Sequence, residues 1–584
     1  MPLPKSEVVV RTAGAAGDGI AATGESFAKV CSRSGLHVFA YNSYQSVIRG
    51  GFVWLQVRAG RTKVQSHGAG TDFLIALNSR ELERHANDVV KGGGILYNKD
   101  KIKPKPGLIR DDITQYPLPV LDITAKHGKN PILQNTVALG ALVKILKINF
   151  SVLSGVLSDT FGSRKKAALE ANLAVSEAGY EYAETFETVD FALDLDYNTR
   201  RPVMTGNQAL ALGAVAAGCK FYAAYPMTPA SSILHWLAAT STRTGILVKQ
   251  AEDEIAVLNM AIGAAFAGVR SMVGTSGGGF SLMSEAIGLA GQTETPVVII
   301  SSQRGGPSTG LPTKTEQADL FQALGASQGD YPKIVLAPST VDDCFSSIVE
   351  AFNLAEKFQV PVIVLSDLYL SEHMESLDGI DLDFSIERGE FAKPDVGSTD
   401  SKNGFKRYAF TESGVSPRSF PGRAGTVFQA SSDEHDDAAN IISDVFTDEE
   451  MRTRMFQKRM RKMERILPEL APPRLEGKNA ADLTLIGWGS TYGMIREAIS
   501  TLGEEGMTLN HLHIKYMLPF HAKQVKEILE SCRNTLTIES NYTGQLSRLI
   551  RMETGFDIKH QLLKYDGEPF YPGQIITKVR EVNN

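Results

Sequence analysis

Short apolar runs rich in valine and isoleucine alternate with helical patterns along most of the chain, and this alternation constrains the fold more than any other feature. Two of the clearest runs are "PVVIISSQ" and "VPVIVLSD". They are almost continuously apolar, as expected of strands that are buried on both faces of a parallel sheet. Strands that alternate with helices predict βαβ units. We therefore predict a multidomain α/β protein.

The chain has 584 residues, which is too long for a single hydrophobic core. We predict four parts, and three of them show the strand–helix alternation: residues 1–199, 200–372 and 479–584. Residues 373–478 have few apolar runs, contain "SSDEHDD" and end in the charged helical pattern "DEEMRTRMFQKRMRKMERIL". We interpret this part as a partly helical interdomain connection.

The composition excludes several classes of function. Hydrophobic residues make up 43% and charged residues 22% of the chain, and the net charge is -6. These values are ordinary for a soluble protein, and they argue against nucleic acid or an anionic membrane as the main partner. No apolar run approaches the roughly 20 residues that span a bilayer. The first residues lack the pattern of a secretory signal, so we expect a cytoplasmic protein.

The cysteines are few and scattered. There are 4 of them, Cys31, Cys219, Cys344 and Cys532, and no C-x-x-C spacing occurs. We interpret them as buried structural thiols in a reducing compartment. Because iron–sulfur clusters are usually held by closely organised thiolates, this chain alone is not expected to hold one.

Three turns at predicted strand ends share one chemistry. They are Tyr225–Pro229 ("YPMTP"), Thr275–Gly279 ("TSGGG") and Gln303–Gly310 ("QRGGPSTG"). In parallel α/β sheets, ligands bind outside the carboxyl ends of the strands. Ordinary βα turns favour the same residue types, so each turn alone also fits a plain connection. Together they supply hydroxyls, backbone N–H groups and Arg304, which is typical of a small anion site.

Three consecutive acids open an apolar helical pattern, "QAEDEIAVLNMAIGAAFAG". Acids favour helix N-termini because of the helix dipole, and this explains one or two of Glu252, Asp253 and Glu254. The apolar continuation predicts a buried helix, which would carry one carboxylate toward an interface.

These segments resemble a known family. "YPMTPAS", "EDEIAVLNMAIGAAFAG", "TSGGGFSLMSEAIGLAGQTETPVVII", "QRGGPSTGLPTKTEQADL" and "IESNYTGQLSRLIRMETG" resemble the α subunit of 2-oxoacid:ferredoxin oxidoreductases. "GAAGDGIAATGESFAKV" and "SYQSVIRGGFVWLQVR" resemble the γ domain of that family, here fused ahead of α. The family usually has YPITPSS, so Met227 and Ala230 depart from it, whereas Thr228 is kept.

The resemblance implies a thiamine diphosphate enzyme. Residues 1–199 would be a γ-type domain, residues 200–372 the pyrimidine-type cofactor domain, and residues 479–584 a transketolase C-terminal-like domain. Glu254 would hydrogen-bond the aminopyrimidine, with Glu252 as the fallback. Thr228 and Arg304 would meet the substrate carboxylate or keto oxygen. The other residues that the resemblance assigns to cofactor or substrate are Tyr225, Pro226, Gly277, Gly278, Ser308 and Thr309.

The resemblance also implies partners. A β subunit would bring Mg²⁺, the diphosphate contacts and a four-iron four-sulfur cluster, in a dimer of heterodimers. Coenzyme A would be the cosubstrate and ferredoxin the electron acceptor. A fused γ–α chain beside a separate β chain resembles the members that use 2-oxoglutarate, so we predict that substrate. Pyruvate or a branched-chain 2-oxoacid remains an alternative, as does a non-catalytic, nucleotide-binding relative. A conventional NAD dehydrogenase is a poorer hypothesis, because no G-x-G-x-x-G opens a βαβ unit.

Other motifs carry weaker hypotheses. Gly17-Asp18-Gly19 lacks the paired asparagines of a thiamine Mg²⁺ site, since only Asn42 stands nearby; a tight turn, or a turn near a nucleotide phosphate such as that of coenzyme A, fits better. His511 and His513 would share a strand face, but with no third metal ligand in view they are interpreted as core or surface histidines. The run Asp433–Asp437 is interpreted as a solvated charge run, and its His435 could reach the active site.

Overall fold

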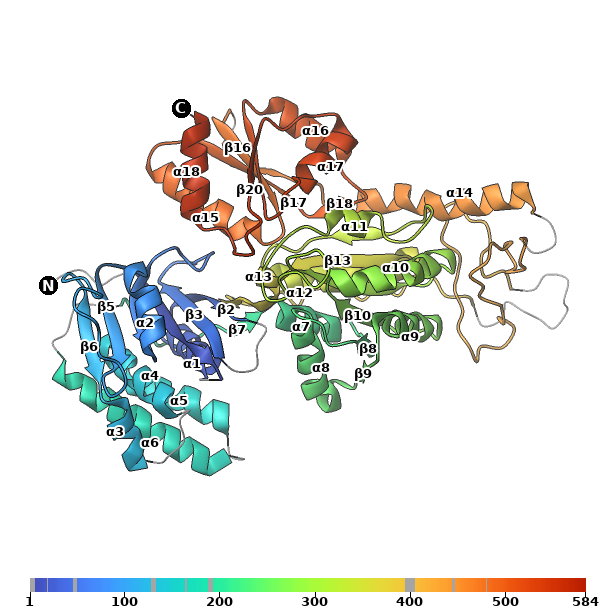
Figure 1. Cartoon of the computed structure of the whole chain (residues 1–584). Coiled ribbons are helices and arrows are strands. Elements are labelled where there is room, and N and C mark those ends of the chain that lie inside the picture. The colour runs from blue at the N-terminus through green and yellow to red at the C-terminus, as the bar shows by residue number, and fades with distance from the viewer. Residues whose placement is uncertain are drawn as a thin grey trace. The chain divides into compact units, whose positions relative to one another are not determined.

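The computed structural model describes residues 6–17, 19–45, 50–127, 133–162, 165–186, 193–393, 405–443, 447–478 and 480–583. These residues form two compact units. The first unit consists of residues 1–205, 372–380 and 571–573, and the second of residues 206–371, 381–570 and 574–584. Figure 1 shows the whole chain, with the first unit mainly in blue and cyan.

The first unit is built on an 8-stranded sheet. In spatial order its strands are β6 (Thr114–Leu118), β5 (Val89–Asn98), β4 (Thr71–Ala76), β1 (Glu7–Ala16), β3 (Gly50–Gly60), β2 (His37–Ser43), β14 (Met374–Ser376) and β7 (Val203–Thr205). Its helices are α1 (Ile20–Arg33), α2 (Ser79–His85), η1 (Ala86–Asp88), α3 (Val120–His127), α4 (Leu133–Ile145), α5 (Phe150–Phe161), α6 (Lys166–Tyr182) and η3 (Ala183–Thr185).

This sheet is mixed, which corrects the prediction of a purely parallel one. Strand β1 is parallel to β4 but antiparallel to β3, and β3 is antiparallel to β2. The chain between Ser43 and Gly50 is too short for a crossover helix, so β2 and β3 must run antiparallel. Buried residues lie on both faces of the sheet: Leu55 and Phe73 pack with Leu139 of α4, whereas Leu74 packs with Leu82 of α2.

The second unit contains two sheets. The 7-stranded sheet has the order β18 (Tyr516–Leu518), β12 (Ile334–Leu336), β13 (Pro361–Asp367), β11 (Val297–Gln303), β10 (Ser271–Thr275), β8 (Phe221–Ala224) and β9 (Leu247–Gln250). The 5-stranded sheet has the order β15 (Leu475–Glu476), β17 (Leu509–Ile514), β16 (Leu483–Trp488), β19 (Thr535–Glu539) and β20 (His560–Leu563). Both sheets are parallel except at the edge strands β18 and β15.

The helices of the second unit follow the predicted alternation. They are α7 (Gly206–Ala216), α8 (Ser231–Thr244), α9 (Glu254–Phe266), α10 (Gly277–Gln292), α11 (Leu320–Leu324), α12 (Val341–Phe358), α13 (Leu368–Glu372), α14 (Glu449–Ile466), η4 (Leu467–Glu469), α15 (Thr491–Glu504), α16 (Ala522–Ser531), α17 (Gln545–Thr554) and α18 (Pro572–Asn583). Figure 1 shows α9 and α10 beside strands β8, β10 and β13.

One hydrophobic core joins the two sheets of the second unit. Val273 and Ile299 of the 7-stranded sheet belong to the same buried cluster as Trp488 and Leu512 of the 5-stranded sheet, with Phe280 of α10. The predicted strand "LNHLHIKYML" contributes to both sheets, because β17 lies in one while β18 pairs antiparallel with β12 in the other. The 5-stranded sheet therefore packs on the sheet that carries the three predicted turns.

The charged helix α14 is less solvated than its sequence suggests. Lys458 and Lys462 are fully buried, and their Nζ atoms lie 2.6 Å and 2.5 Å from the two carboxylate oxygens of Glu294. Glu294 follows α10, and the backbone carbonyl of Glu294 also accepts a hydrogen bond from Arg407 in the connection. These ion pairs attach helix α14 to the segment that follows α10 of the 7-stranded-sheet region.

Candidate active site

Four neighbouring strands of the 7-stranded sheet present the predicted turns at one edge. Strands β11, β10, β8 and β9 are consecutive in the sheet and parallel. Their carboxyl ends lead into the turns that begin at Arg304, Ser276 and Tyr225 and into the start of α9 at Glu254. The carboxyl ends of parallel strands lie at the same sheet edge, so segments far apart in sequence meet there.

A cavity of about 590 Å³ lies between these turns. It is lined by Met227, by Ser276 to Gly278, by the turn from Arg304 to Thr309, and by Ser281, Asp319 and Gln322. Of the residues predicted from sequence, Gly277, Gly278, Arg304, Ser308 and Thr309 thus line one cavity. Tyr225, Pro226, Thr228 and Glu254 lie beside it rather than in its lining.

Arg304 connects two of the turns. Its Nη1 donates a hydrogen bond of 2.8 Å to the backbone carbonyl of Thr228. The guanidinium group is therefore held in position by the turn after β8 while it lines the cavity. A planar guanidinium group held at the wall of a cavity is suited to carboxylate recognition.

Glu254 is the first residue of α9 and is only 2% exposed. Thr275 Oγ1, at the end of β10, donates a hydrogen bond of 3.5 Å to Glu254 Oε1. Burial raises the pKa of Glu254, and the Thr275 hydroxyl opposes this shift. A Cβ atom at Gly279 would collide with both Glu254 Oε1 and Thr275 Oγ1, so glycine is required for the close approach of α10. The result is a buried carboxyl group beside a glycine-rich helix start.

The other two acids of this segment face solvent. Glu252 and Asp253 are exposed, and Asp253 caps α9 by accepting a hydrogen bond of 2.7 Å from the backbone N–H of Ala256. The helix itself is less buried than predicted: Ile255 is 51% and Met260 is 39% exposed. The apolar sequence of α9 therefore covers two faces, of which only one packs on the sheet.

Two further carboxyl groups at the site were not singled out by the sequence analysis. Burial, and then the nearby charge of Glu316, raise the pKa of Asp319 to about 6, while Arg304 opposes the shift. Glu316 Oε2 accepts a hydrogen bond of 3.3 Å from the backbone N–H of Gly306, and burial raises its pKa as well. Both residues lie within "QRGGPSTGLPTKTEQADL", where the only sequence signal was an acid close to a glycine-rich turn.

The residues present fit the aminopyrimidine part of a thiamine cofactor. A buried carboxyl group such as Glu254 is the kind of group that can hydrogen-bond a ring nitrogen. Within the described ranges, no group of three or more His, Cys, Asp or Glu side chains is arranged to hold a metal ion. Three of the four cysteines, Cys31, Cys219 and Cys344, are buried, whereas Cys532 is partly exposed. Burial raises the pKa of Cys219 to about 12, as expected of a structural thiol.

The weaker motifs lie outside this cavity. Gly17 and Gly19 have positive φ angles of 94° and 80°, which suits a tight turn, while Asp18 lies outside the described residues. Asn42 lies in β2. His435 is fully buried and packs against Tyr408, with ring centroids 4.0 Å apart and the rings tilted by 35°, so it lies within the connection and does not line the cavity.

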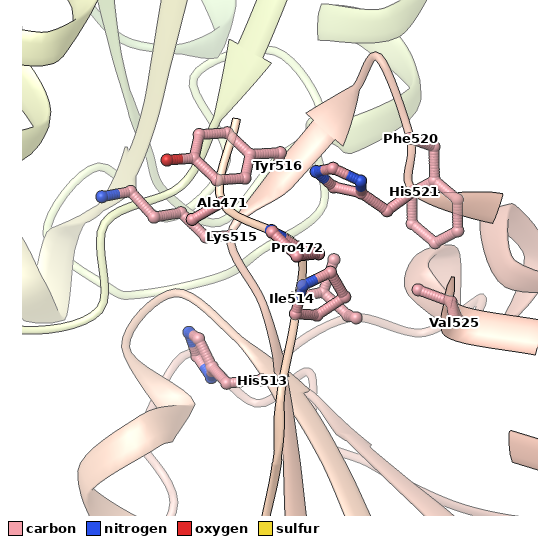
Figure 2. A pocket seen from close by; sticks show the side chains of 10 residues that line it. Ala471, Pro472, His513, Ile514, Lys515, Tyr516, Phe520, His521 and Val525 are labelled. Atoms are coloured by element: carbon pink, nitrogen blue, oxygen red, sulfur yellow. The ribbon is translucent and has the colours of Figure 1, made fainter. Parts of the chain in front are cut away.

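His511 and His513 lie two residues apart in β17, with ring centroids 5.5 Å apart. Burial lowers the pKa of both, that of His513 to about 4, so both rings are neutral near pH 7. His513 and His521 line a separate pocket of about 240 Å³, and Figure 2 shows their rings at different places around it. Since no third ligand lies near them among the described residues, His511 and His513 do not form a metal site.

The fold places the chain in the multidomain α/β class, and a matching family description adds a thiamine-diphosphate-binding domain. Three family descriptions match the chain. "Pyruvate ferredoxin/flavodoxin oxidoreductase" matches residues 9–182, "Pyruvate flavodoxin/ferredoxin oxidoreductase, thiamine diP-bdg" matches residues 212–454, and "Pyruvate:ferredoxin oxidoreductase core domain II" matches residues 481–575.

Similar proteins show which group of oxidoreductases the chain belongs to. The 2-oxoacid:ferredoxin oxidoreductase subunit alpha of a Sulfolobus species is 31% identical over 95% of this chain and 94% of its own. The 2-oxoglutarate oxidoreductase subunit KorA of Mycobacterium tuberculosis is 32% identical over 97% of this chain and 90% of its own. The chain is also similar to a solved structure of 2-oxoglutarate:ferredoxin oxidoreductase from Magnetococcus marinus, with 2-oxoglutarate, coenzyme A and succinyl-CoA bound (TM-score 0.91, 34% identity, 99% of this chain and 100% of that one). This protein belongs to the 2-oxoacid:ferredoxin oxidoreductase family, as an α subunit of these oxidoreductases.

None of the helices in the described ranges is both long and apolar enough to span a lipid bilayer.

Proposed function

We propose that this chain is a fused γ–α subunit that, with a β subunit, catalyses the oxidative decarboxylation of 2-oxoglutarate. The products would be an acyl-coenzyme A and CO₂, and ferredoxin would be reduced in the cytoplasm. In this proposal residues 1–199 are the γ-type domain and residues 200–372 the pyrimidine-type domain. Residues 373–478 are the connection and residues 479–584 the transketolase C-terminal-like domain.

The observation that carries the proposal is the buried carboxyl group of Glu254 beside the cavity that Arg304 lines. Thiamine diphosphate, when bound, supplies the carbanion chemistry that decarboxylation of a 2-oxoacid requires. Glu254 would hydrogen-bond a ring nitrogen of the aminopyrimidine and hold a proton there. Thr275 would orient this carboxyl group, and Gly279, having no side chain, leaves room for both groups.

Arg304 would bind the carboxylate of the 2-oxoacid, because its guanidinium group lines the cavity and is fixed by the carbonyl of Thr228. The hydroxyls of Ser308 and Thr309 lie in the same turn and would donate to the substrate. Thr228 would orient the substrate through its hydroxyl. Tyr225, Pro226, Gly277 and Gly278 would contact the cofactor.

A β subunit would complete the site with Mg²⁺, the diphosphate contacts and a four-iron four-sulfur cluster, in a dimer of heterodimers. Exposed apolar side chains support a partner here. Large apolar residues more than a third exposed occur on the turn after β8, on β9, on α9 and on α10: Tyr225, Leu247, Ile255, Met260 and Leu282. Exposed apolar residues gathered on adjacent elements are typical of protein–protein interfaces.

Three comparisons support the finer parts of the proposal. The names of the M. tuberculosis relative and the M. marinus structure both state 2-oxoglutarate. A 2-oxoglutarate synthase subunit KorA from Methanothermobacter thermautotrophicus aligns over 100% of its own length but only 66% of this chain. A third of this chain therefore has no counterpart in that α subunit, as expected if a γ domain is fused here.

The test is reconstitution with the β subunit. The complex should reduce a viologen dye with 2-oxoglutarate, coenzyme A and thiamine diphosphate, and should be much slower with pyruvate or a branched-chain 2-oxoacid. A complex that is faster with pyruvate would refute the substrate. A complex that is inactive with all 2-oxoacids, although folded and loaded with cofactor, would refute the catalytic function.

A further inference from the structure

Asp319 occupies a helix-capping position without capping the helix. It immediately precedes α11, where an aspartate usually accepts a hydrogen bond from a backbone N–H of the first turn. In this structure the Asp319 side chain makes no such bond, and the N–H of Phe321 is instead bonded by Gln545 Oε1 at 3.2 Å. The carboxyl group of Asp319 is thereby left to line the cavity.

The carboxyl group is held against the glycine turn. The backbone N–H of Asp319 donates a hydrogen bond of 2.9 Å to Gln303 Oε1, which fixes the residue at the end of β11. A Cβ atom at Gly277 would collide with Asp319 Oδ2, so the carboxyl oxygen lies directly beside the first turn of α10. Asp319 is thus aimed at the same space as Arg304.

The charged groups around Asp319 come from three segments. Arg304 follows β11, and Glu316 lies three residues before Asp319 in the chain. Asp566, after β20, acts on Glu316. Asp319 lines the cavity and Glu316 lies near it; when both are ionised, their two negative charges outweigh the single charge of Arg304. Since burial raises the pKa of Asp319 to about 6, its charge changes just below neutral pH.

We propose that Asp319 is a specificity-determining residue that couples binding of the anionic substrate to uptake of a proton by its own carboxyl group. This inference rests on the proposed function of the cavity as the 2-oxoacid site. A substrate that carries negative charge binds best when Asp319 is neutral, because a neutral carboxyl group does not repel it and can donate a hydrogen bond. A dianion such as 2-oxoglutarate is affected more than a monoanion such as pyruvate.

The first experiment measures KM against pH in the complex with the β subunit. Above about pH 6, Asp319 loses its proton and repels the substrate, so KM for 2-oxoglutarate should rise by about tenfold or more by pH 8.5. The rise for pyruvate should be smaller, and kcat should change less than KM. In Asp319→Asn, KM for 2-oxoglutarate should hardly change with pH. In Asp319→Glu, KM should still rise with pH. The control Asp342→Asn removes an exposed acid from the first turn of α12, outside the cavity, and should leave the wild-type profile unchanged.

The second experiment measures proton uptake directly. Calorimetric titration of 2-oxoglutarate into the complex at pH 7, in two buffers of different ionisation enthalpy, should show proton uptake with wild type and little with Asp319→Asn. Equal profiles and equal uptake for wild type and Asp319→Asn would overturn the inference, even if the enzyme is active. An inactive wild-type complex would instead count against the proposed function, so the two failures are distinguishable.

Discussion

Replacing Glu294 by glutamine should destabilise the second unit strongly. Glu294, Lys458 and Lys462 are all fully buried, and one carboxylate serves both ammonium groups. Glutamine keeps the size of the side chain and removes its charge, which leaves two buried cations without an anion. Removing one partner of a buried ion pair costs about 3–5 kcal/mol, because the remaining charge is not compensated.

Glu412→Gln is the matched control. Glu412 pairs with Arg465, which lies in α14 as Lys458 and Lys462 do, but the Glu412 side chain is 93% exposed. An exposed pair contributes roughly 0–1 kcal/mol, so this variant should unfold almost like wild type. The assay is urea unfolding of the chain, followed by a spectroscopic probe of the second unit.

The stability that Glu294→Gln loses should also depend on pH. Burial already lowers the pKa of Lys458 to about 7, and the charge of Glu294 opposes this shift. Without Glu294 the pKa of both lysines falls further below that of an unfolded lysine, so folding then favours their neutral form. Stability of the variant should therefore fall as pH decreases from 9 to 6, more steeply than that of wild type. If Glu294→Gln lowers the free energy of unfolding by less than about 1 kcal/mol at pH 6, as Glu412→Gln should, the buried ion pairs do not hold the connection in place.

The remaining predictions concern the active site. Glu254→Gln should abolish viologen reduction while the fold is retained, whereas Glu252→Gln, which changes an exposed acid, should be nearly as active as wild type; the opposite result would transfer the cofactor role to Glu252. Arg304→Ala should lower kcat/KM for the 2-oxoacid by about tenfold or more, since a charge-assisted hydrogen bond contributes about 1.5–3 kcal/mol, and lysine should restore only part; an unchanged kcat/KM would remove Arg304 from the site. Gly279→Ala should cost about 1–3 kcal/mol of stability, measured by urea unfolding, through its collision with Glu254.

The sequence predicted the site's position better than its detailed composition. The carboxyl ends of parallel strands necessarily share an edge, so the turns at Arg304, Ser276 and Tyr225 could be brought together from strand patterns alone. The position of Asp319 could not be predicted in this way. Its carboxyl group faces the cavity because Gln545, more than two hundred residues later in the chain, satisfies the helix N–H that Asp319 would otherwise cap.

The fold differs from the prediction where a local pattern is overridden by distant contacts. The lysines of α14 resemble those of a solvated helix face, yet a single buried carboxylate pairs with two of them. An apolar run can form either a parallel or an antiparallel strand. Strand β3 runs antiparallel to β2 because the connection after Ser43 is too short for a crossover helix. Ile255 of α9 is 51% exposed although its sequence context is that of a core helix, so the apolar pattern alone could not predict which face of α9 packs on the sheet.

We propose that this chain carries only the pyrimidine half of a thiamine site. The most direct measurement is calorimetric binding of thiamine diphosphate with Mg²⁺, together with iron content, for the chain alone and for its complex with the β subunit. We expect the chain alone to be colourless, to bind the cofactor poorly and to reduce no ferredoxin. The complex should gain iron, cofactor binding and ferredoxin reduction together. A lone chain that contains iron, or that decarboxylates a 2-oxoacid unaided, would contradict the account.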